Sequence, residues 1–288
     1  MHTTLTSRSQ TVVIGHDRPF CVIGERINPT GRKAFAAQLR EGDLSQVLVD
    51  VQEQVTAGAH VLDVNMGVPL TDEAELLANA VRLVQEHTDL PLCIDSSVVE
   101  ALEAGLDAYQ GKALVNSVTA EDDRLELILP LVKRHGAAVI ALANDETGIP
   151  ATAQERIDLT GKILRVATEE YGIPAEDIVI DPLAMTVGAD PTAVNVTLET
   201  IRGISGQYDL NMSLGASNVS FGLPARHALN AAFIPLAAAA GLTSAIMDAR
   251  TPQIVEAARA SDILLGKDEW GANWIGHHRA AVASAAGA

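Results

Sequence analysis

The sequence has few of the residues on which several common kinds of protein chemistry depend. Only two of its 288 residues are cysteines, Cys21 and Cys93, and no CxxC pair or Cys/His cluster with zinc spacing occurs. A disulfide scaffold is therefore excluded, and the two thiols are expected to be buried and reduced, as in cytoplasmic proteins. Aromatic residues make up 3% of the chain. A glycosidase with paired carboxylates is disfavoured, because so few aromatics hardly supply platforms for sugars.

Positive charge and long hydrophobic runs are also scarce. Lysine and arginine number 20 against 37 acidic residues, which gives a formal net charge of −17. Such a surface disfavours nucleic acid and anionic membranes as partners. No apolar run approaches the roughly 20 residues that span a bilayer, and residues 1–10 lack the apolar core of a secretion signal. We therefore expect a cytoplasmic protein without a membrane or nucleic-acid partner.

Short apolar runs alternate with segments of helical periodicity along most of the chain. Eight such units without a linker or a shift in composition predict a single-domain (β/α)8 barrel of the α/β class. An open doubly wound sheet is the alternative, but it usually carries a glycine-rich first turn, and no G-x-G-x-x-G is present. The runs predicted to be strands span residues 20–24, 60–65, 91–95, 113–117, 137–143, 177–181, 212–216 and 243–248.

The predicted barrel occupies residues 20–276. Residues 1–19 are expected to form an extended lead-in, and the Ala-rich residues 277–288 a flexible tail. After the seventh strand, Pro224 is expected to open the next helix at its first position.

Nearly every predicted strand ends on a carboxylate or a carboxamide. In barrels of this kind the chemistry takes place at the carboxyl ends of the strands. Asp and Asn also favour turns for local reasons, so each one alone is weak evidence. Together they suit a neutral heterocycle with many hydrogen-bonding edges better than a phosphate, and no motif commits to a metal. The strand-end residues are Glu25, Asn28, Asp63, Asn65, Asp95, Asn116, Asn144, Asp181, Asn218 and Asp248.

The motifs at these strand ends resemble those of the pterin-binding enzymes. They are most similar to methyltetrahydrofolate:corrinoid methyltransferases and to the folate domain of cobalamin-dependent methionine synthase. The resemblance runs from about Val22 to Gly266. Its motifs are Val22-Ile-Gly-Glu25-Arg-Ile-Asn28, Leu62-Asp-Val-Asn65, Cys93-Ile-Asp95-Ser, Val115-Asn116-Ser, Ile180-Asp181-Pro-Leu and Ser217-Asn218-Val-Ser220.

This resemblance implies a (β/α)8 barrel, usually a homodimer, with tetrahydrofolate or 5-methyltetrahydrofolate as substrate. Asp95 and Asp181 match the family's pterin carboxylates, and Asn116 matches its pterin carboxamide. Asn218 matches the asparagine that approaches the pterin N5, and it is the expected catalytic residue. The residues expected to bind the pterin are Asp95, Asn116, Asp181, Asn218, Asp63, Asn65, Glu25 and Asn28.

The implied activity is that of a methyltransferase acting between N5 of tetrahydrofolate and the cobalt of a corrinoid (cobalamin), in a direction left open. The sequence has no D-x-H-x-x-G motif for cobalamin, so the corrinoid is expected on a separate protein. Dihydropteroate synthase is the nearest alternative, but it typically places a Lys and a Ser-x-Arg near strands seven and eight, where this chain has Ser217-Asn218-Val219-Ser220 and Ser244-Ala245-Ile246. A pterin-binding barrel without catalysis is a further alternative. The bases available to the anionic folate tail are Arg26, Arg32, Lys33 and Arg226.

Overall fold

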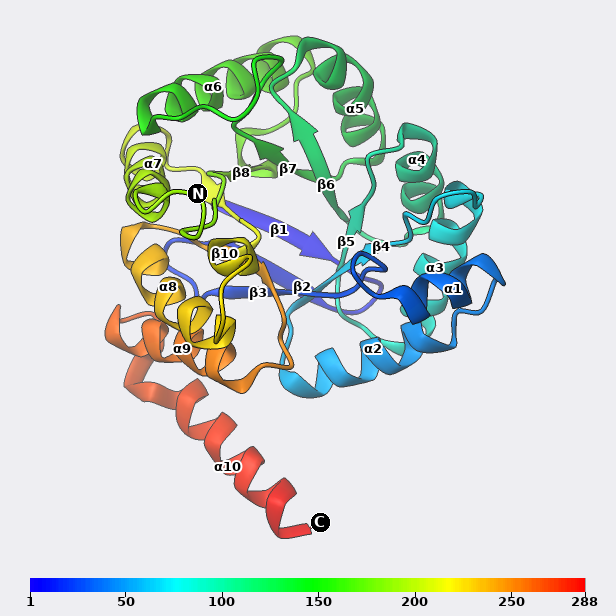
Figure 1. Ribbon diagram of the computed structural model, residues 1–288, viewed down its shortest axis with the longest axis vertical. Helices are drawn as coiled ribbons and strands as arrows, with labels where there is room; N and C mark the ends of the chain where they lie inside the picture. Colours follow the sequence, from blue (N-terminus) through cyan, green and yellow to red (C-terminus); the bar gives the residue numbers. More distant parts are fainter. Residues whose placement is uncertain (288) are drawn as a thin grey trace.

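Eight parallel strands run through the middle of the molecule, with helices around them (Figure 1). The computed structural model describes the backbone of residues 1–287 and the side chains of residues 1–280 and 282. The strands are hydrogen-bonded in the order β10-β3-β4-β5-β6-β7-β8-β9. They are β3 (Cys21–Ile27), β4 (Val61–Asn65), β5 (Leu92–Asp95), β6 (Leu114–Thr119), β7 (Ala138–Leu142), β8 (Ile178–Asp181), β9 (Asn211–Met212) and β10 (Ser244–Met247).

The two ends of this sheet meet between β9 and β10. The backbone N–H of Ile246 donates to the carbonyl of Leu214 at 2.9 Å, and the backbone N–H of Met212 donates to Thr243 Oγ1 at 2.9 Å. Gly215 and Ile246 form a parallel bridge at the same seam. The fold is therefore the single-domain (β/α)8 barrel that the sequence predicts.

The helices that surround the barrel bury one face toward the strands, and some of their ends carry capping residues. Asp72 accepts a hydrogen bond from the backbone N–H of Glu75 and so caps α3. Gly58 ends α2 with a φ of 90°, a conformation that favours glycine. The helices are α1 (Lys33–Arg40), α2 (Ser45–Ala57), α3 (Glu73–His87), α4 (Val99–Ala108), α5 (Asp122–His135), α6 (Ala153–Arg165), α7 (Ala193–Tyr208), α8 (Arg226–Ala240), α9 (Pro252–Leu264) and α10 (Ala272–Gly287). None of the described helices has the length and hydrophobicity needed to cross a membrane.

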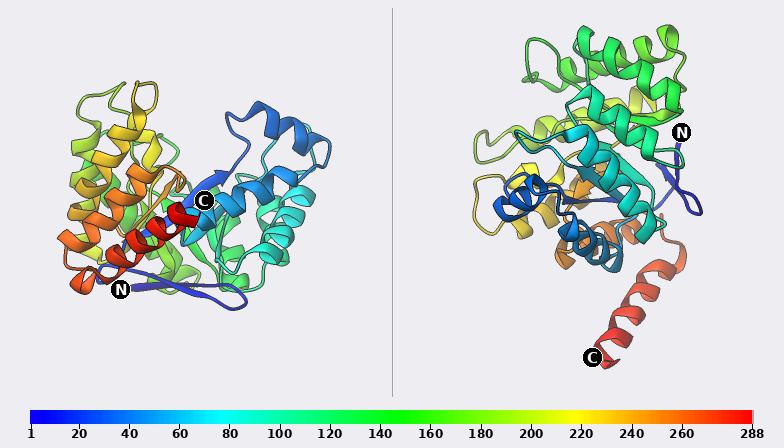
Figure 2. Two further views of the ribbon diagram at one scale, coloured as in Figure 1. Left: turned by 90° about the horizontal axis from the view of Figure 1, so that it is seen from below. Right: turned by 90° about the vertical axis from the view of Figure 1, so that its right-hand side faces the viewer.

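The lead-in folds into an antiparallel hairpin, β1 (His2–Thr6) and β2 (Thr11–Gly15), rather than a single extended segment. Leu5 and Ile14 are fully buried and pack into the barrel interior with Cys21 and Cys93. The hairpin crosses the end of the barrel opposite to α1 (Figure 2). The barrel is thus closed at its lower end, so that a ligand enters from the carboxyl ends of the strands.

Two predicted boundaries around the seventh strand were wrong. The strand β9 ends at Met212, whereas the prediction continued it to Ala216. The chain then forms the short 3-10 turn η3 (Ala216–Ser220). The next helix begins at Arg226 rather than at Pro224, because Ala225 adopts a left-handed conformation with a φ of 52°. The turn therefore stands between strand and helix, with Val219 buried beneath it.

The segment from His277, expected as a flexible tail, continues α10 as far as Gly287. Its flexibility stays a prediction, and Ala288 lies outside the described residues. Figure 1 shows α10 projecting away from the barrel beyond α9.

Candidate functional site

The carboxyl ends of β4, β5 and β6 bring four of the predicted residues together. Asn65, Asp95 and Asn116 are neighbours in the strand register. Asn65 Nδ2 donates to Asp95 Oδ2 at 2.9 Å, and Asn116 Nδ2 donates to Asp63 Oδ1 at 3.1 Å. Each carboxylate is therefore oriented by one carboxamide, and both lie in the mouth of the barrel.

Burial makes these carboxyls unusually weak acids. Burial raises the pKa of Asp63 to about 6, against the hydrogen bond from Asn116. Burial and the neighbouring charge of Asp63 raise the pKa of Asp95 well above its ordinary value. The charge of one carboxylate therefore opposes ionisation of the other. With the carboxamides of Asn65 and Asn116, the network can both donate hydrogen bonds to a heterocycle and accept them from it.

Asp181 faces the same mouth from the end of β8. Burial raises the pKa of Asp181 to about 7, although the backbone N–H of Leu183 donates to its Oδ1 at 2.8 Å. The loop behind it is fixed by Arg156, a buried arginine of α6. Arg156 Nη1 donates to the carbonyls of Pro182 at 2.9 Å and Leu183 at 2.7 Å. No sequence motif marks this arginine, and its positioning role was missed.

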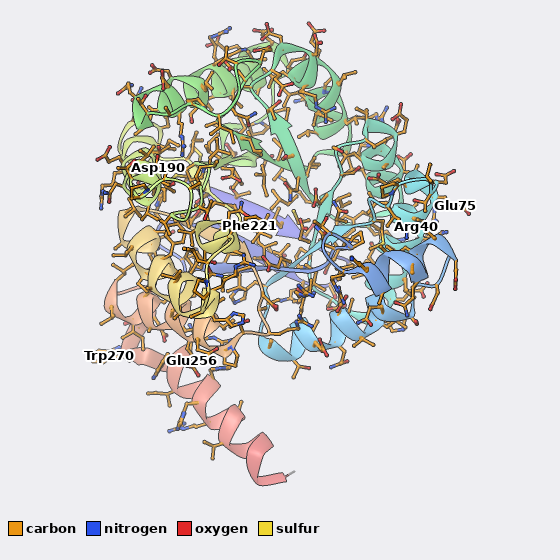
Figure 3. The ribbon with its side chains drawn as sticks, viewed as in Figure 1. Arg40, Glu75, Asp190, Phe221, Glu256 and Trp270 are labelled. Carbon is orange, nitrogen blue, oxygen red and sulfur yellow. The ribbon has the colours of Figure 1, made fainter. Side chains whose placement is uncertain are left out.

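Asn218 lies on the exposed side of the η3 turn. Among the described residues, none forms a hydrogen bond with its side chain, so the carboxamide is available to a ligand. Gly215 leaves it room, since a Cβ there would lie 2.9 Å from Asn218 Nδ2. Phe221, which follows the turn, is labelled in Figure 3 within the ring of helices. Because η3 follows the carboxyl end of β9, the predicted catalytic residue lies at the same end of the barrel as the mouth.

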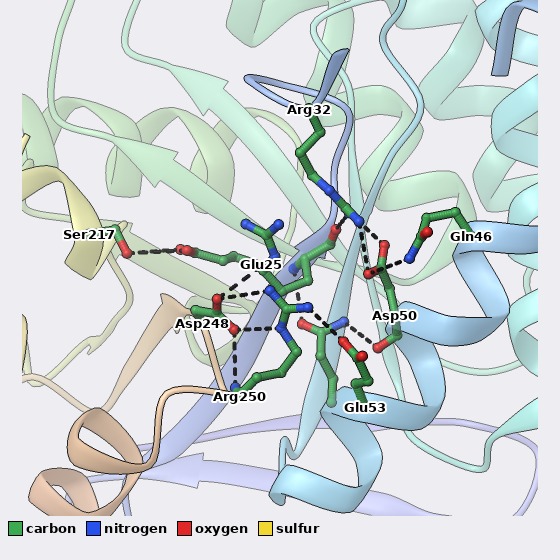
Figure 4. Close-up of polar contacts among 10 residues, drawn as sticks. Glu25, Arg32, Gln46, Asp50, Glu53, Ser217, Asp248 and Arg250 are labelled. Carbon is green, nitrogen blue, oxygen red and sulfur yellow. Dashed lines mark hydrogen bonds and ion pairs between the residues drawn. The ribbon is translucent and has the colours of Figure 1, made fainter. Parts of the chain in front are cut away.

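Glu25 and Asn28, both predicted to bind the pterin, form no hydrogen bond with the described residues of the carboxyl network. Glu25 extends from β3 toward Ser217, whose hydroxyl donates to its two oxygens at 3.2 Å (Figure 4). Burial and the nearby charge of Asp248 raise the pKa of Glu25 to about 7. Asn28 instead accepts a local hydrogen bond from the backbone N–H of Thr30 at 2.8 Å. The structure thus joins Glu25 to the η3 turn and leaves Asn28 in its own turn.

One of the four candidate bases is committed to a buried acid. Arg32 donates to both oxygens of the fully buried Asp50, at 2.5 and 3.0 Å (Figure 4). The same guanidinium donates to the carbonyl of Arg26 at 2.5 Å. Arg32 therefore joins β3 to α2 and is not free for a ligand. Lys33 is exposed at the start of α1.

The described side chains give no evidence of a metal site. No group of three or more His, Cys, Asp or Glu residues among them is arranged to hold an ion. Asn144, at the end of β7, has a buried Oδ1 without a hydrogen-bond partner in the same part of the chain. The mouth is therefore a set of carboxyl and carboxamide groups suited to a neutral, hydrogen-bonding ring.

Solved structures with the same fold are dihydropteroate synthases. The enzyme of Yersinia pestis with a pterine-sulfa conjugate matches with a TM-score of 0.70 and 19% identity, covering 92% of this chain and 99% of that one. The Xanthomonas albilineans enzyme in complex with 7,8-dihydropteroate matches with a TM-score of 0.69 and 19% identity, covering 91% and 98%. At this identity the likeness shows the fold alone.

Sequence relatives extend the comparison. Methylcorrinoid:tetrahydrofolate methyltransferase of Eubacterium limosum is 33% identical over 253 residues, which cover 86% of this chain and 92% of that protein. Methionine synthase of Mycobacterium tuberculosis is 34% identical over 259 residues, covering 85% of this chain. The match spans only 22% of the length of that synthase. The model of the pterin binding enzyme family matches residues 24–248, which include every strand-end residue named above. The chain therefore belongs to the pterin-binding enzyme family.

Proposed function

We propose that this protein is a methyltransferase that moves a methyl group between N5 of tetrahydrofolate and the cobalt of a corrinoid. The observation that carries the proposal is the exposed Asn218 carboxamide in the turn after β9, at the same end of the parallel barrel as the buried carboxyl network. A synthase joining a pterin diphosphate to p-aminobenzoate would favour a cation at this turn, where the chain has Ser217-Asn218-Val219-Ser220 and no base. Similarity to a methyltransferase along 92% of that protein's length supports the same choice.

In this proposal, some residues at the mouth bind the pterin and another assists the methyl transfer. Asp95, Asn116 and Asp181 bind the donor and acceptor edges of the pterin. Asn218 donates a hydrogen bond to N5 as negative charge develops there during loss of the methyl group. A donor of this kind contributes about 2–4 kcal/mol to the transition state. The proton that N5 finally takes comes from water or from the carboxyl network.

The corrinoid is a substrate carried by a separate protein that docks over the open mouth. The relative of similar length carries the word methylcorrinoid in its name, which supports this partner. A homodimeric, cytoplasmic enzyme remains the expectation from the family resemblance and from the two buried, free thiols. The direction of transfer in the cell is left to experiment.

The test is spectroscopic and uses the purified full chain. Mixing it with cob(I)alamin and 5-methyltetrahydrofolate should convert the cob(I)alamin spectrum to that of methylcobalamin, or methylcobalamin and tetrahydrofolate should give the reverse. Asn218→Ala should slow the conversion, whereas Asn195→Ala, on the exposed face of α7, should not. Binding of the pterin without transfer in either direction would overturn the proposal, and synthesis of pteroate from a pterin diphosphate would replace it.

A further inference from the structure

The η3 turn, which carries Asn218, is anchored to three other segments of the barrel. Its second half is held through backbone carbonyls by the loop after β8. The backbone N–H of Val187 donates to the carbonyl of Val219 at 3.0 Å. Thr186 Oγ1 donates to the carbonyl of Phe221 at 2.7 Å. The first half of the turn, which leads into Asn218, is instead held by side chains of β3 and α8.

Glu25 anchors the first half of the turn from β3. Ser217 Oγ donates to Glu25 Oε1 and Oε2, each at 3.2 Å (Figure 4). Among the described residues, Ser217 is the only hydrogen-bond partner of this carboxyl. The nearby guanidinium groups of Arg26 and Arg250 form ion pairs with Asp248 instead. Burying an acid without a cationic partner is costly, which indicates that Glu25 has a role other than stability.

Arg226, the first residue of α8, anchors the same half of the turn. Its Nη2 donates to the carbonyl of Ser217 at 2.7 Å, and its Nε donates to Ser220 Oγ at 3.1 Å. Ser220 is fully buried, and its hydroxyl donates to the carbonyl of Ser217 at 3.3 Å. The hydroxyl and the carbonyl of Ser217 are thus held by two different segments of the barrel.

The position of the Asn218 carboxamide depends on these anchors, because the side chain has none of its own. No described residue forms a hydrogen bond with it, so the backbone of the turn determines where the group lies. Within the turn, the backbone N–H of Asn218 donates to the carbonyl of Gly215 at 3.1 Å. A catalytic group displaced by about 1 Å from the reacting atom can lose most of its effect on the rate.

We propose that Glu25 and Arg226 are positioning residues for the methyl transfer, a claim that rests on the proposed function. Both act through Ser217, which directly precedes Asn218 in the turn. Together they hold the Asn218 carboxamide where it donates to N5 in the transition state. In this assignment Glu25 acts on the turn rather than on the pterin itself.

The experiment measures rate and binding separately in the purified full chain. Single-turnover transfer from 5-methyltetrahydrofolate to cob(I)alamin gives the rate, and equilibrium titration gives the dissociation constant of 5-methyltetrahydrofolate. Ser217→Ala should lower the rate about tenfold and leave the dissociation constant within about twofold of the wild type, because only the hydroxyl that reaches Glu25 is removed. Glu25→Ala should lower the rate by a similar factor. Glu25→Gln, which keeps an acceptor oxygen, should recover most of that loss.

Further comparisons separate positioning from a general structural effect. In the Asn218→Ala background, Ser217→Ala should lower the rate no further, because the two residues act as a unit. Arg226→Lys keeps the charge but cannot donate to both acceptors, so it should lower the rate as Ser217→Ala does. Hydrogen exchange, which needs no methyl transfer, should be faster in residues 216–221 of Ser217→Ala than in the wild type. Ser45→Ala, an exposed change at the start of α2, should alter none of these measurements.

The outcomes that would overturn the positioning role are distinct from failure of the proposed function. Additive losses in the double variant, or equal losses of rate and affinity in Ser217→Ala, would overturn it. So would a Ser217→Ala variant with the rate and the hydrogen exchange of the wild type. A wild-type rate in Arg226→Lys would remove Arg226 from the assignment. A wild type that binds the pterin but transfers no methyl group in either direction would overturn the proposed function and the positioning role with it.

Discussion

Replacing Glu25 with glutamine should make the protein more stable at alkaline pH. Glu25 is buried at the end of β3, where burial and the charge of Asp248 raise its pKa from 4.5 to about 7. Glutamine has the shape of the protonated acid and can still accept the hydrogen bond from Ser217. The variant therefore keeps the favourable neutral form at every pH.

The size of the effect follows from the two pKa values. A rise from 4.5 to about 7 corresponds to about 3 kcal/mol, at about 1.4 kcal/mol for each pH unit. Since the folded state binds the proton more tightly than the unfolded state, the stability that neutral Glu25 contributes is present below pH 4.5. It is lost as the pH rises to about 7, and no more is lost above that.

Urea unfolding followed by circular dichroism measures this difference. Between about pH 5.5 and about pH 8.5, the stability advantage of Glu25→Gln over the wild type should grow by about 2 kcal/mol. Glu199→Gln, an exposed change on α7, should show no such growth. An advantage that stays constant over this range, or a variant that loses stability as the pH rises, would refute the assignment of a neutral Glu25.

Three further substitutions test the site and its support. Asn218→Ala should lower the methyl-transfer rate about 10²–10³-fold in a cob(I)alamin assay while the pterin dissociation constant changes little, because it removes a donor used in the transition state. Asp95→Asn should weaken pterin binding about tenfold or more by titration, since its amide sets a donor against the donors of the pterin. Arg32→Gln should lower the free energy of unfolding by about 3 kcal/mol, because it leaves the buried Asp50 without its partner.

Each of these three predictions has a result that would contradict it. Equal, small losses of rate and binding in Asn218→Ala would remove its catalytic role. Unchanged pterin affinity in Asp95→Asn would remove that residue from the pocket. Wild-type stability in Arg32→Gln, measured by urea unfolding, would show that Asp50 does not depend on its guanidinium.

The sequence predicts the barrel because short apolar runs alternate regularly with segments of helical periodicity. Nearly every predicted strand is followed by a carboxylate or a carboxamide, and glycines such as Gly58 and Gly136 end helices in left-handed conformations. The neighbouring positions of Asn65, Asp95 and Asn116 also follow, since parallel strands align their carboxyl ends. These features depend on local residue patterns, which a single sequence displays.

Features that depend on packing between distant segments could not be predicted in this way. The hairpin that closes the barrel depends on Leu5 and Ile14, whose apolar character is ordinary in a lead-in. Arg156 holds the β8 loop through backbone carbonyls, which leave no trace in the sequence. The buried Oδ1 of Asn230, which has no hydrogen-bond partner in the described part of the chain, becomes visible only when α8 is packed against α9 and η3.

The N-terminal hairpin covers the end of the barrel opposite to the mouth, where the buried acids stand at the ends of their strands. Leu5 and Ile14 are fully buried there and pack against the barrel interior. Protons of Asp63, Asp95 and Asp181 therefore exchange through the same opening by which a ligand enters. On the proposed function, a pterin bound in that opening would cover the side of these carboxyls that faces water. Proton uptake or release would then be coupled to binding and dissociation of the substrate.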